Sequence, residues 1–150
     1  MELYFAPLSC SLATRIALYE TGQEAGFYRV VMATKQTEDG RDYLAINPKG
    51  QVPALVTDAG EVLTEGPAVL QYVADLAPES GLAPAAGTLE RTRLHQWLNY
   101  ISSELHKAVY FMLFNPAIPT AMKDYARGSV GAKYDLLSAH LADRAYLVGD

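Results

Sequence analysis

Two turn-rich stretches flank a short apolar run and hold residues suited to binding a small peptide: Asn47 to Pro53, and Leu63 to Gly66. Proline lacks the N–H that a sheet ladder needs, so the start of a strand is one of the few positions in a sheet that tolerate it. If the Val52–Pro53 bond is cis, the N–H and C=O of Val52 face solvent and can pair with an extended peptide. An ordinary loop proline is the alternative, and the dipeptide alone favours it.

Glu65 stands where the second stretch passes into a predicted helix with Pro67 in its first turn. The helix dipole favours a carboxylate there by about 0.3–1 kcal/mol, which is a sufficient structural reason for an acid at this position. The functional interpretation is a receptor for a zwitterion. Backbone N–H groups would bind an α-carboxylate, and Glu65 would bind an α-ammonium.

Cys10 is the single cysteine of the chain, and it lies at or just before a predicted helix N-terminus. That position lowers a thiol pKa, because the helix dipole and the N–H groups favour the thiolate. A buried, inert cysteine is the alternative. One cysteine excludes an internal disulfide and a dithiol cycle within the chain, but it leaves one-thiol chemistry with an external thiol open.

Another polar group lies on a later helix, where Asn99, Ser103, His106 and Lys107 recur at spacings of three and four and share roughly one face. A solvated helix face is the alternative. The residues that follow would form either core or a pocket for an apolar compound: Tyr110, Phe111, Leu113 and Phe114. No Cys/His cluster has metal-ligand spacing, and no glycine-rich phosphate loop is present, so we expect no metal.

The elements that must position these residues are an α/β domain followed by helices. The first half predicts a strand at 2–5, a helix from Cys10 to Gly22, a strand at 27–31, a polar loop at 33–40 with Lys35, a short helix at 41–46, a hairpin turned at 58–60 and a helix to about Leu76. The order β-α-β-α-β-β-α, with a right-handed crossover and a hairpin, is a thioredoxin-like arrangement.

Composition predicts a linker at 77–87, and strand signals stop beyond it. One long helix begins at Thr88 and is broken at 115–119, and a second runs from about Ala121 to Leu141. Two helices with wide apolar stripes normally need further helices to cover them. We therefore expect a thioredoxin-like domain at 1–80 and an incomplete all-α domain at 87–150.

Composition limits the classes of partner. The 150 residues are 50% hydrophobic, enough for one core or two small ones, and the net charge of −5 argues against general nucleic-acid binding. No apolar run reaches the roughly 18 residues of a membrane span, and the N-terminus lacks a secretory pattern. We expect a cytoplasmic protein that binds neither nucleic acid nor membrane.

Several motifs follow one another in the order and spacing of a known family: Ser9-Cys10-Ser11-Leu12, Leu44 to Leu55 with Asn-Pro-Lys-Gly-Gln-Val-Pro, Leu63-Thr64-Glu65-Gly66-Pro67-Ala68, Gln71 to Leu76, and Trp97 to Lys107. By these motifs the chain resembles the bacterial, beta-class cytosolic glutathione transferases over its whole length. The resemblance implies a thioredoxin-like domain with a cis-proline, an all-helical domain and a homodimer. It also implies conjugation of reduced glutathione, as co-substrate, to hydrophobic electrophiles.

The resemblance also implies roles for individual residues. Val52, beside cis Pro53, would bind the cysteinyl backbone of glutathione, and Cys10 would face the sulfur. The remaining implied contacts are Glu65 and Gly66 for the γ-glutamyl end, Lys35 for the glycine carboxylate, Asn99, Ser103 and Glu104 reaching across from a partner subunit, His106 near Cys10, and Phe5, His106, Tyr110, Phe111 and Phe114 for the hydrophobic substrate.

Two departures from the family pattern qualify these roles. Phe5 stands where many members carry tyrosine, so a hydroxyl that could assist the thiolate is missing. Cys10 would then assist it, with Ser11 and His106 as further candidates. Family members also continue beyond Asp150, and we therefore expect either a fragment or a reduced helical domain. Three functions remain open: a transferase with a detoxifying or catabolic role, a glutathione-dependent thiol reductase using a Cys10 mixed disulfide, and a non-catalytic module that binds glutathione or an apolar ligand.

Overall fold

The computed structural model describes residues 1–149 and divides into two units. The first unit is Met1–Ala83, and the second begins at Pro84. This boundary falls within the 77–87 stretch whose composition predicts a linker, where the single-turn helix η1 spans Pro78–Ser80. The order of an α/β unit followed by an all-α unit agrees with the fold class expected from the sequence.

A five-stranded mixed sheet forms the centre of the first unit, with strand order β3-β2-β1-β4-β5. The parallel pair β1–β2 is joined through α1, and the other three pairs are antiparallel. The strands and helices of this unit are β1 Glu2–Phe5, α1 Ser11–Glu20, β2 Gly26–Val31, β3 Gln36–Thr37, α2 Tyr43–Ile46, β4 Ala54–Val56, β5 Val62–Thr64 and α3 Gly66–Asp75.

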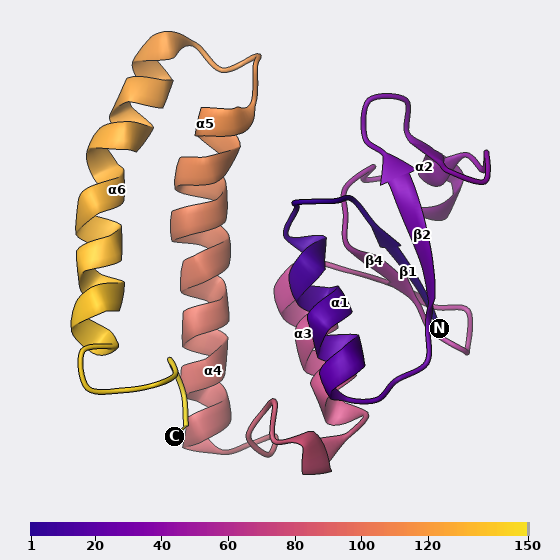
Figure 1. Ribbon diagram of the computed structural model, residues 1–150, viewed down its shortest axis with the longest axis horizontal. Helices are drawn as coiled ribbons and strands as arrows, with labels where there is room; N and C mark the ends of the chain where they lie inside the picture. Colours follow the sequence, from indigo (N-terminus) through magenta and orange to yellow (C-terminus); the bar gives the residue numbers. More distant parts are fainter. Residues whose placement is uncertain (150) are drawn as a thin grey trace. The chain divides into compact units, whose positions relative to one another are not determined.

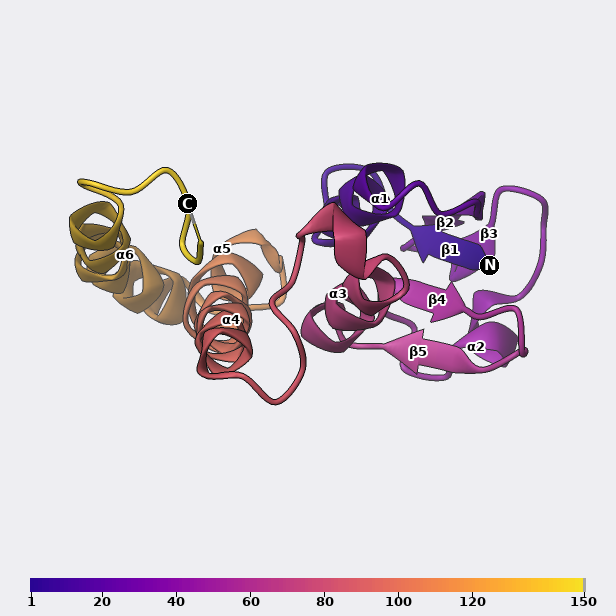
Figure 2. The same ribbon diagram turned by 90° about the horizontal axis from the view of Figure 1, so that it is seen from below.

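The two faces of the sheet carry separate cores, because successive residues of a strand point to opposite sides. Leu3 faces α1 and α3 and packs in a buried cluster with Leu18, Leu55 and Val69. Tyr4, the next residue, faces the other side and packs with Val30, Tyr43 and Ala54. Figure 2 shows α1 and α3 on one side of the strands and α2 on the other. The thioredoxin-like arrangement is confirmed.

The expected polar loop at 33–40 was wrong in one respect, because it contains β3. Thr37 pairs with Val30, and Gln36 pairs with Val31. Lys35 adopts a positive φ of 57°, which helps reverse the chain between β2 and β3. A strand of two residues is too short for the alternation of polar and apolar residues by which strands are predicted.

A helical hairpin forms the second unit (Figure 1). Its first arm is continuous through α4 Leu89–Tyr100, η2 Ile101–Phe111 and α5 Met112–Phe114, and its second arm is α6 Thr120–His140. The expected long helix is present up to residue 114, but its middle part, η2, is a π-helix with i→i+5 hydrogen bonds. Spacings of three and four do not reveal one extra residue per turn.

Polar contacts between the two arms supplement a small apolar contact. Leu105, Val109 and Ala126 are the buried apolar side chains of the described part of this unit. The Tyr100 hydroxyl donates to the carbonyl of Lys133 at 3.0 Å.

Among the helices of residues 1–149, none combines the length and the apolar character that a membrane span needs.

Candidate functional site

Cys10 caps the N-terminus of α1, and its side chain is exposed. The thiol donates a hydrogen bond to the carbonyl oxygen of Val52, with Sγ and O 3.3 Å apart. The Val52–Pro53 peptide bond that follows is cis. The structure therefore brings Cys10 to Val52 and Pro53, although Cys10 lies more than 40 residues before them in the sequence.

Ser11 and Phe5 lie close to Cys10 in sequence, but their side chains make other contacts. Ser11 is fully buried, and its hydroxyl accepts from the Ala6 N–H at 3.1 Å, so it braces the loop before α1. The Phe5 ring packs against the core beneath α1, and the Arg15 guanidinium lies 5.2 Å from the ring centroid. Ser11 therefore holds the loop before α1, and Phe5 belongs to the packing under that helix.

The loop from Asn47 to Val52 is organised by the side chain of Asn47, which is 2% exposed. Its Oδ1 accepts from the Lys49 N–H at 3.1 Å, and its Nδ2 donates to the Gln51 carbonyl at 2.8 Å. The Gly50 N–H donates to the Asn47 carbonyl at 2.9 Å. Sequence reasoning gave Asn47 no role of its own, although an asparagine before a proline is a turn signal.

Lys35 joins this loop from the β2–β3 connection. Its ammonium donates to the carbonyl of Gly50 at 2.8 Å, and its side chain is half-buried. The backbone carbonyl of Lys35 accepts from the N–H of Tyr43 at 2.9 Å, which fixes the connection to α2. The predicted cation therefore lies at the edge of the loop that carries Val52.

Glu65 precedes α3 but makes no side-chain capping hydrogen bond to it. Instead its carboxylate pairs with Lys49, with Oε1 and Nζ 2.9 Å apart, and Lys49 also donates to the Thr64 hydroxyl at 2.9 Å. The dipole explanation for an acid here is therefore incomplete. Sequence reasoning missed Lys49, because a spacing of sixteen residues carries no signal of a pair.

The backbone of Glu65 has a positive φ of 68°. A non-glycine residue in such a conformation costs of order 1–3 kcal/mol, and such residues cluster at ligand sites. The next residue, Gly66, begins α3, and a Cβ added there would meet no atom within 4 Å. The side chain of Glu65 is 65% exposed, so a second cation can reach it.

The predicted residues of the second unit form a separate group along α4, η2 and α5. Asn99 and Ser103 are exposed, whereas Glu104 already pairs with Lys133 of α6 at 2.5 Å. That ion pair lowers the pKa of Glu104, first through its hydrogen bond from Lys133 and then through the lysine charge. Glu104 therefore links the two helical arms within one chain.

His106 is half-buried on η2, and burial, followed by the charge of Lys107, lowers the pKa of its imidazole. A neutral imidazole is therefore favoured there. The Tyr110 and Phe114 rings stack with centroids 5.9 Å apart, and the Lys107 ammonium lies 5.3 Å from the Phe111 ring centroid. Phe111 and Phe114 are exposed, so this aromatic group is available to an apolar compound.

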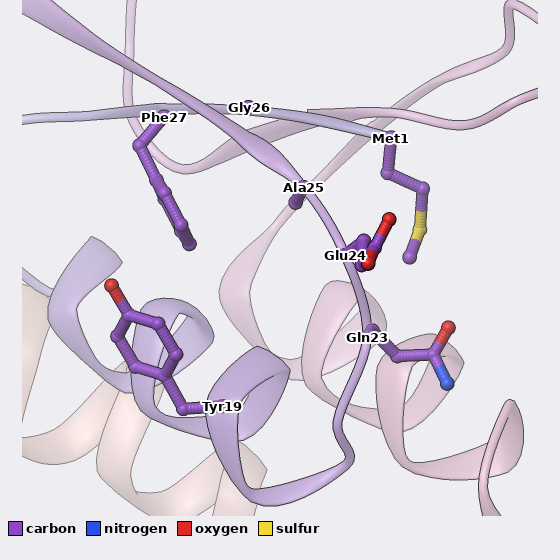
Figure 3. A pocket seen from close by; sticks show the side chains of 7 residues that line it. All are labelled: Met1, Tyr19, Gln23, Glu24, Ala25, Gly26 and Phe27. Atoms are coloured by element: carbon purple, nitrogen blue, oxygen red, sulfur yellow. The ribbon is translucent and has the colours of Figure 1, made fainter.

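A separate surface pocket of about 620 Å³ lies at the C-terminal end of α1. Figure 3 shows the Tyr19 and Phe27 rings on one side of it and Met1 and Gln23 on the other. Cys10 stands at the opposite end of this ten-residue helix, about 15 Å away along its axis. The pocket therefore does not belong to the site around Cys10.

Three charged or reactive positions surround the loop 50–53: the Cys10 thiol, the Lys35 ammonium and the Glu65–Lys49 pair. Such a surface offers backbone groups to an extended peptide, cations to its carboxylates and an acid to its ammonium. Within residues 1–149, no three His, Cys, Asp or Glu side chains are grouped so that they could hold a metal ion.

Comparison with known proteins identifies close relatives. A family model described as "Glutathione S-transferase, N-terminal domain" matches residues 9–76. Glutathione S-transferase GstA of Escherichia coli O157:H7 is 40% identical over 149 residues, which are 99% of this chain and 74% of that protein.

Two solved structures are similar to this chain over nearly its whole length. A sphingomonad glutathione S-transferase complexed with glutathione is 47% identical with a TM-score of 0.95, and the match covers 100% of this chain and 74% of that one. A beta-class glutathione S-transferase of Sphingomonas chungbukensis is 44% identical with a TM-score of 0.95, and the match covers 99% of this chain and 74% of that one. This chain thus spans about three-quarters of each of these relatives.

Proposed function

This chain belongs to the bacterial glutathione S-transferases, and we propose that it joins the thiol of reduced glutathione to hydrophobic electrophiles. The observation that carries the proposal is the contact between Cys10 and Val52 at the cis Val52–Pro53 bond. A tripeptide aligned along Val52 has its central cysteine beside the N-terminus of α1. A thiolate is the favoured form of a thiol at such a helix end, and the thiolate is the attacking species.

The charges around this loop match those of glutathione, which has two carboxylates and one ammonium. Glu65 is the group for the γ-glutamyl ammonium, and the N-terminus of α3 at Gly66 is the site for the neighbouring carboxylate. Lys35 is the cation for the glycine carboxylate. This assignment uses both ends of the tripeptide, so it predicts selectivity against peptides that lack either end.

The second unit completes the proposal. Asn99, Ser103 and Glu104 reach the tripeptide from the partner subunit of a homodimer, and His106 approaches the thiol. The electrophile binds against Phe5, His106 and the exposed aromatic group of Tyr110, Phe111 and Phe114. The proposed location is cytoplasmic and the proposed role is detoxification or a catabolic step; the net charge of −5 suits a dissolved enzyme.

Calorimetric titration of reduced glutathione into the wild-type chain and Glu65→Gln tests the assignment of the γ-glutamyl end. We expect the dissociation constant to rise about tenfold or more, because a hydrogen bond to a charged group is worth about 1.5–3 kcal/mol. Glu61→Gln removes the same charge from an exposed position of the hairpin and serves as the matched control. An equal dissociation constant for all three proteins would remove Glu65 from the site.

A glutathione-dependent thiol reductase is the second candidate, because the Cys10 side chain is exposed beside the proposed peptide site. Its thiolate would attack a mixed disulfide between glutathione and a substrate thiol, form a Cys10–glutathione disulfide and release the substrate thiolate; a glutathione thiolate would then attack that disulfide, restore the Cys10 thiolate and leave as oxidised glutathione. Cys10→Ser abolishes this cycle but leaves conjugation of an aryl halide measurable. Loss of both activities would show that Cys10 does more than position the glutathione thiol.

A further inference from the structure

The carbonyl oxygen of Gln51 is held from the protein interior by two side chains. The Tyr43 hydroxyl donates to it at 2.6 Å, and the Asn47 amide donates to it at 2.8 Å. Tyr43 is 0% exposed and Asn47 is 2% exposed. Neither side chain can therefore touch a ligand, and both aim their polar atoms at the residue before Val52.

The Gln51 carbonyl and the Val52 N–H belong to the same peptide group. This group is planar and trans, so its C=O and N–H point in opposite directions. Anchoring the oxygen towards Tyr43 and Asn47 turns the Val52 N–H away from the interior. Among the hydrogen bonds of residues 1–149, none is donated by the Val52 N–H.

We propose that Tyr43 is a positioning residue for glutathione, whose hydroxyl fixes the Gln51–Val52 peptide plane so that the Val52 N–H is held ready for the ligand. The proposal rests on the proposed function, because it assigns that N–H to the cysteinyl backbone. It adds a buried residue to the determinants of binding. An N–H that is already oriented saves the ligand the entropy of ordering the loop.

Tyr43 also contacts the turn that carries Lys35, through its backbone. Its N–H donates to the carbonyl of Lys35 at 2.9 Å. Tyr43, the first residue of α2, thus links the β2–β3 turn that carries Lys35 to the loop that carries Val52. A change of the hydroxyl alone leaves the Lys35 contact intact, so the two contributions can be separated.

Tyr4 provides a matched control. Its ring lies in the same cluster, 1% exposed, with its centroid 5.7 Å from that of Tyr43. Its hydroxyl, however, donates to Glu2 at 2.6 Å and accepts from Arg41 at 2.7 Å, and neither partner belongs to the loop 47–53. Tyr43→Phe and Tyr4→Phe therefore remove the same group from the same core, but only Tyr43→Phe removes a hydrogen bond to the loop that carries Val52.

The experiment compares glutathione dissociation constants, steady-state constants and thermal unfolding of the wild type, Tyr43→Phe and Tyr4→Phe. We expect Tyr43→Phe to raise the dissociation constant and the KM for glutathione about three- to tenfold, as for one neutral hydrogen bond, with kcat at saturation retained. Tyr4→Phe should lose stability but keep the wild-type affinity. Equal affinities in all three proteins, or losses of affinity that follow the losses of stability, would overturn the proposal.

Hydrogen exchange of the Val52 amide gives a second test, which uses the wild type alone and so does not depend on whether a variant folds. The amide should exchange readily without ligand and become protected with glutathione. Protection without ligand would contradict an N–H turned towards solvent. Failure of Tyr43→Phe to alter affinity while Glu65→Gln still weakens binding would overturn this inference alone, whereas no binding of glutathione by the wild type would overturn the proposed function.

Discussion

At the scale of single residues, Lys49 changes the interpretation of Glu65. Without ligand, the lysine ammonium occupies the carboxylate that the γ-glutamyl ammonium is proposed to bind. Exposed ion pairs of this kind are worth about 0–1 kcal/mol, so a ligand can displace or share the lysine at little cost. Lys49 is therefore an internal competitor that reduces how strongly the site distinguishes a ligand with an α-ammonium from one without it.

Lys49→Met tests this competition. We compare its affinity for glutathione with its affinity for the analogue in which a hydrogen replaces the α-amino group. The ratio of the two affinities should be about two- to fivefold larger than in the wild type, because Glu65 then has no other cation. Both ligands lose the same lysine, so its general attraction for anions cancels in the ratio. A ratio equal to or below that of the wild type would exclude the competition.

His106 gives the stability of the protein a pH dependence with a definite sign. Its folded-state pKa is lowered below the ordinary value of 6.5, first by burial and then by Lys107, so the unfolded chain takes up the proton first. Stability is therefore fully present above about pH 6.5 and is lost as the pH falls from there through the folded-state pKa. Thermal unfolding of His106→Gln should show a shallower decline over this window than the wild type. Parallel curves would show that another group causes the decline.

At the scale of elements, the turn before Val52 depends on one glycine. Gly50 has a positive φ of 60°, and a Cβ added there would lie 3.0 Å from Leu44 Cδ2 and 3.5 Å from Lys35 Cδ. Any other residue would meet both backbone strain and a crowded neighbour. The turn thereby couples the geometry of the loop to the position of the Lys35 side chain.

Gly50→Ala and Gly60→Ala separate the two effects. Gly60 also has a positive φ, 82°, but an added Cβ would meet nothing within 4 Å. Denaturant unfolding should show a loss of roughly 1 kcal/mol for Gly60→Ala, from strain alone, and a larger loss for Gly50→Ala. Only Gly50→Ala should also weaken glutathione binding. Equal losses of stability would mean that Leu44 and Lys35 move aside freely.

How much of this arrangement could be predicted differs between elements. Periodicity and turn residues were enough for α1, α3 and the hairpin, because each has the length and pattern of a regular element. The two-residue β3 and the π-helix η2 leave no such pattern. In the site, Cys10 and Glu65 were candidates from residue type and position, whereas Lys35 was a candidate through the family resemblance. The Tyr43 hydroxyl and Lys49 meet partners eight and sixteen residues away, so no local pattern indicates them, whereas the local contacts of Asn47 carry the turn signal of an asparagine before a proline.

At the scale of the whole molecule, an acidic protein is proposed to bind an anionic tripeptide. The net charge of −5 repels such a ligand at a distance, so local cations must offset the repulsion. Lys35 lies at the loop 50–53 and has this role in the proposal. Such an attraction between partly exposed charges weakens when salt screens it.

Lys35→Ala should therefore weaken glutathione binding, and the factor by which it does so should shrink as the salt concentration rises from about 0.01 M to 1 M. Lys123→Ala, on α6, removes the same charge from the second unit and should have little effect at any salt concentration. Dissociation constants measured across this range check the prediction. A factor independent of salt would assign Lys35 a structural role in place of an electrostatic one.

The π-helix η2 also affects how related sequences can be aligned. An i→i+5 turn takes up one residue more than an α-turn, and one residue in an α-helix corresponds to a rotation of about 100°. Over the eleven residues of η2, an α-helical relative therefore needs about two residues fewer to keep both ends of the arm in the same orientation. A gap of that length in this segment is thus a conversion between two helix types, and the residues on either side of it remain equivalent.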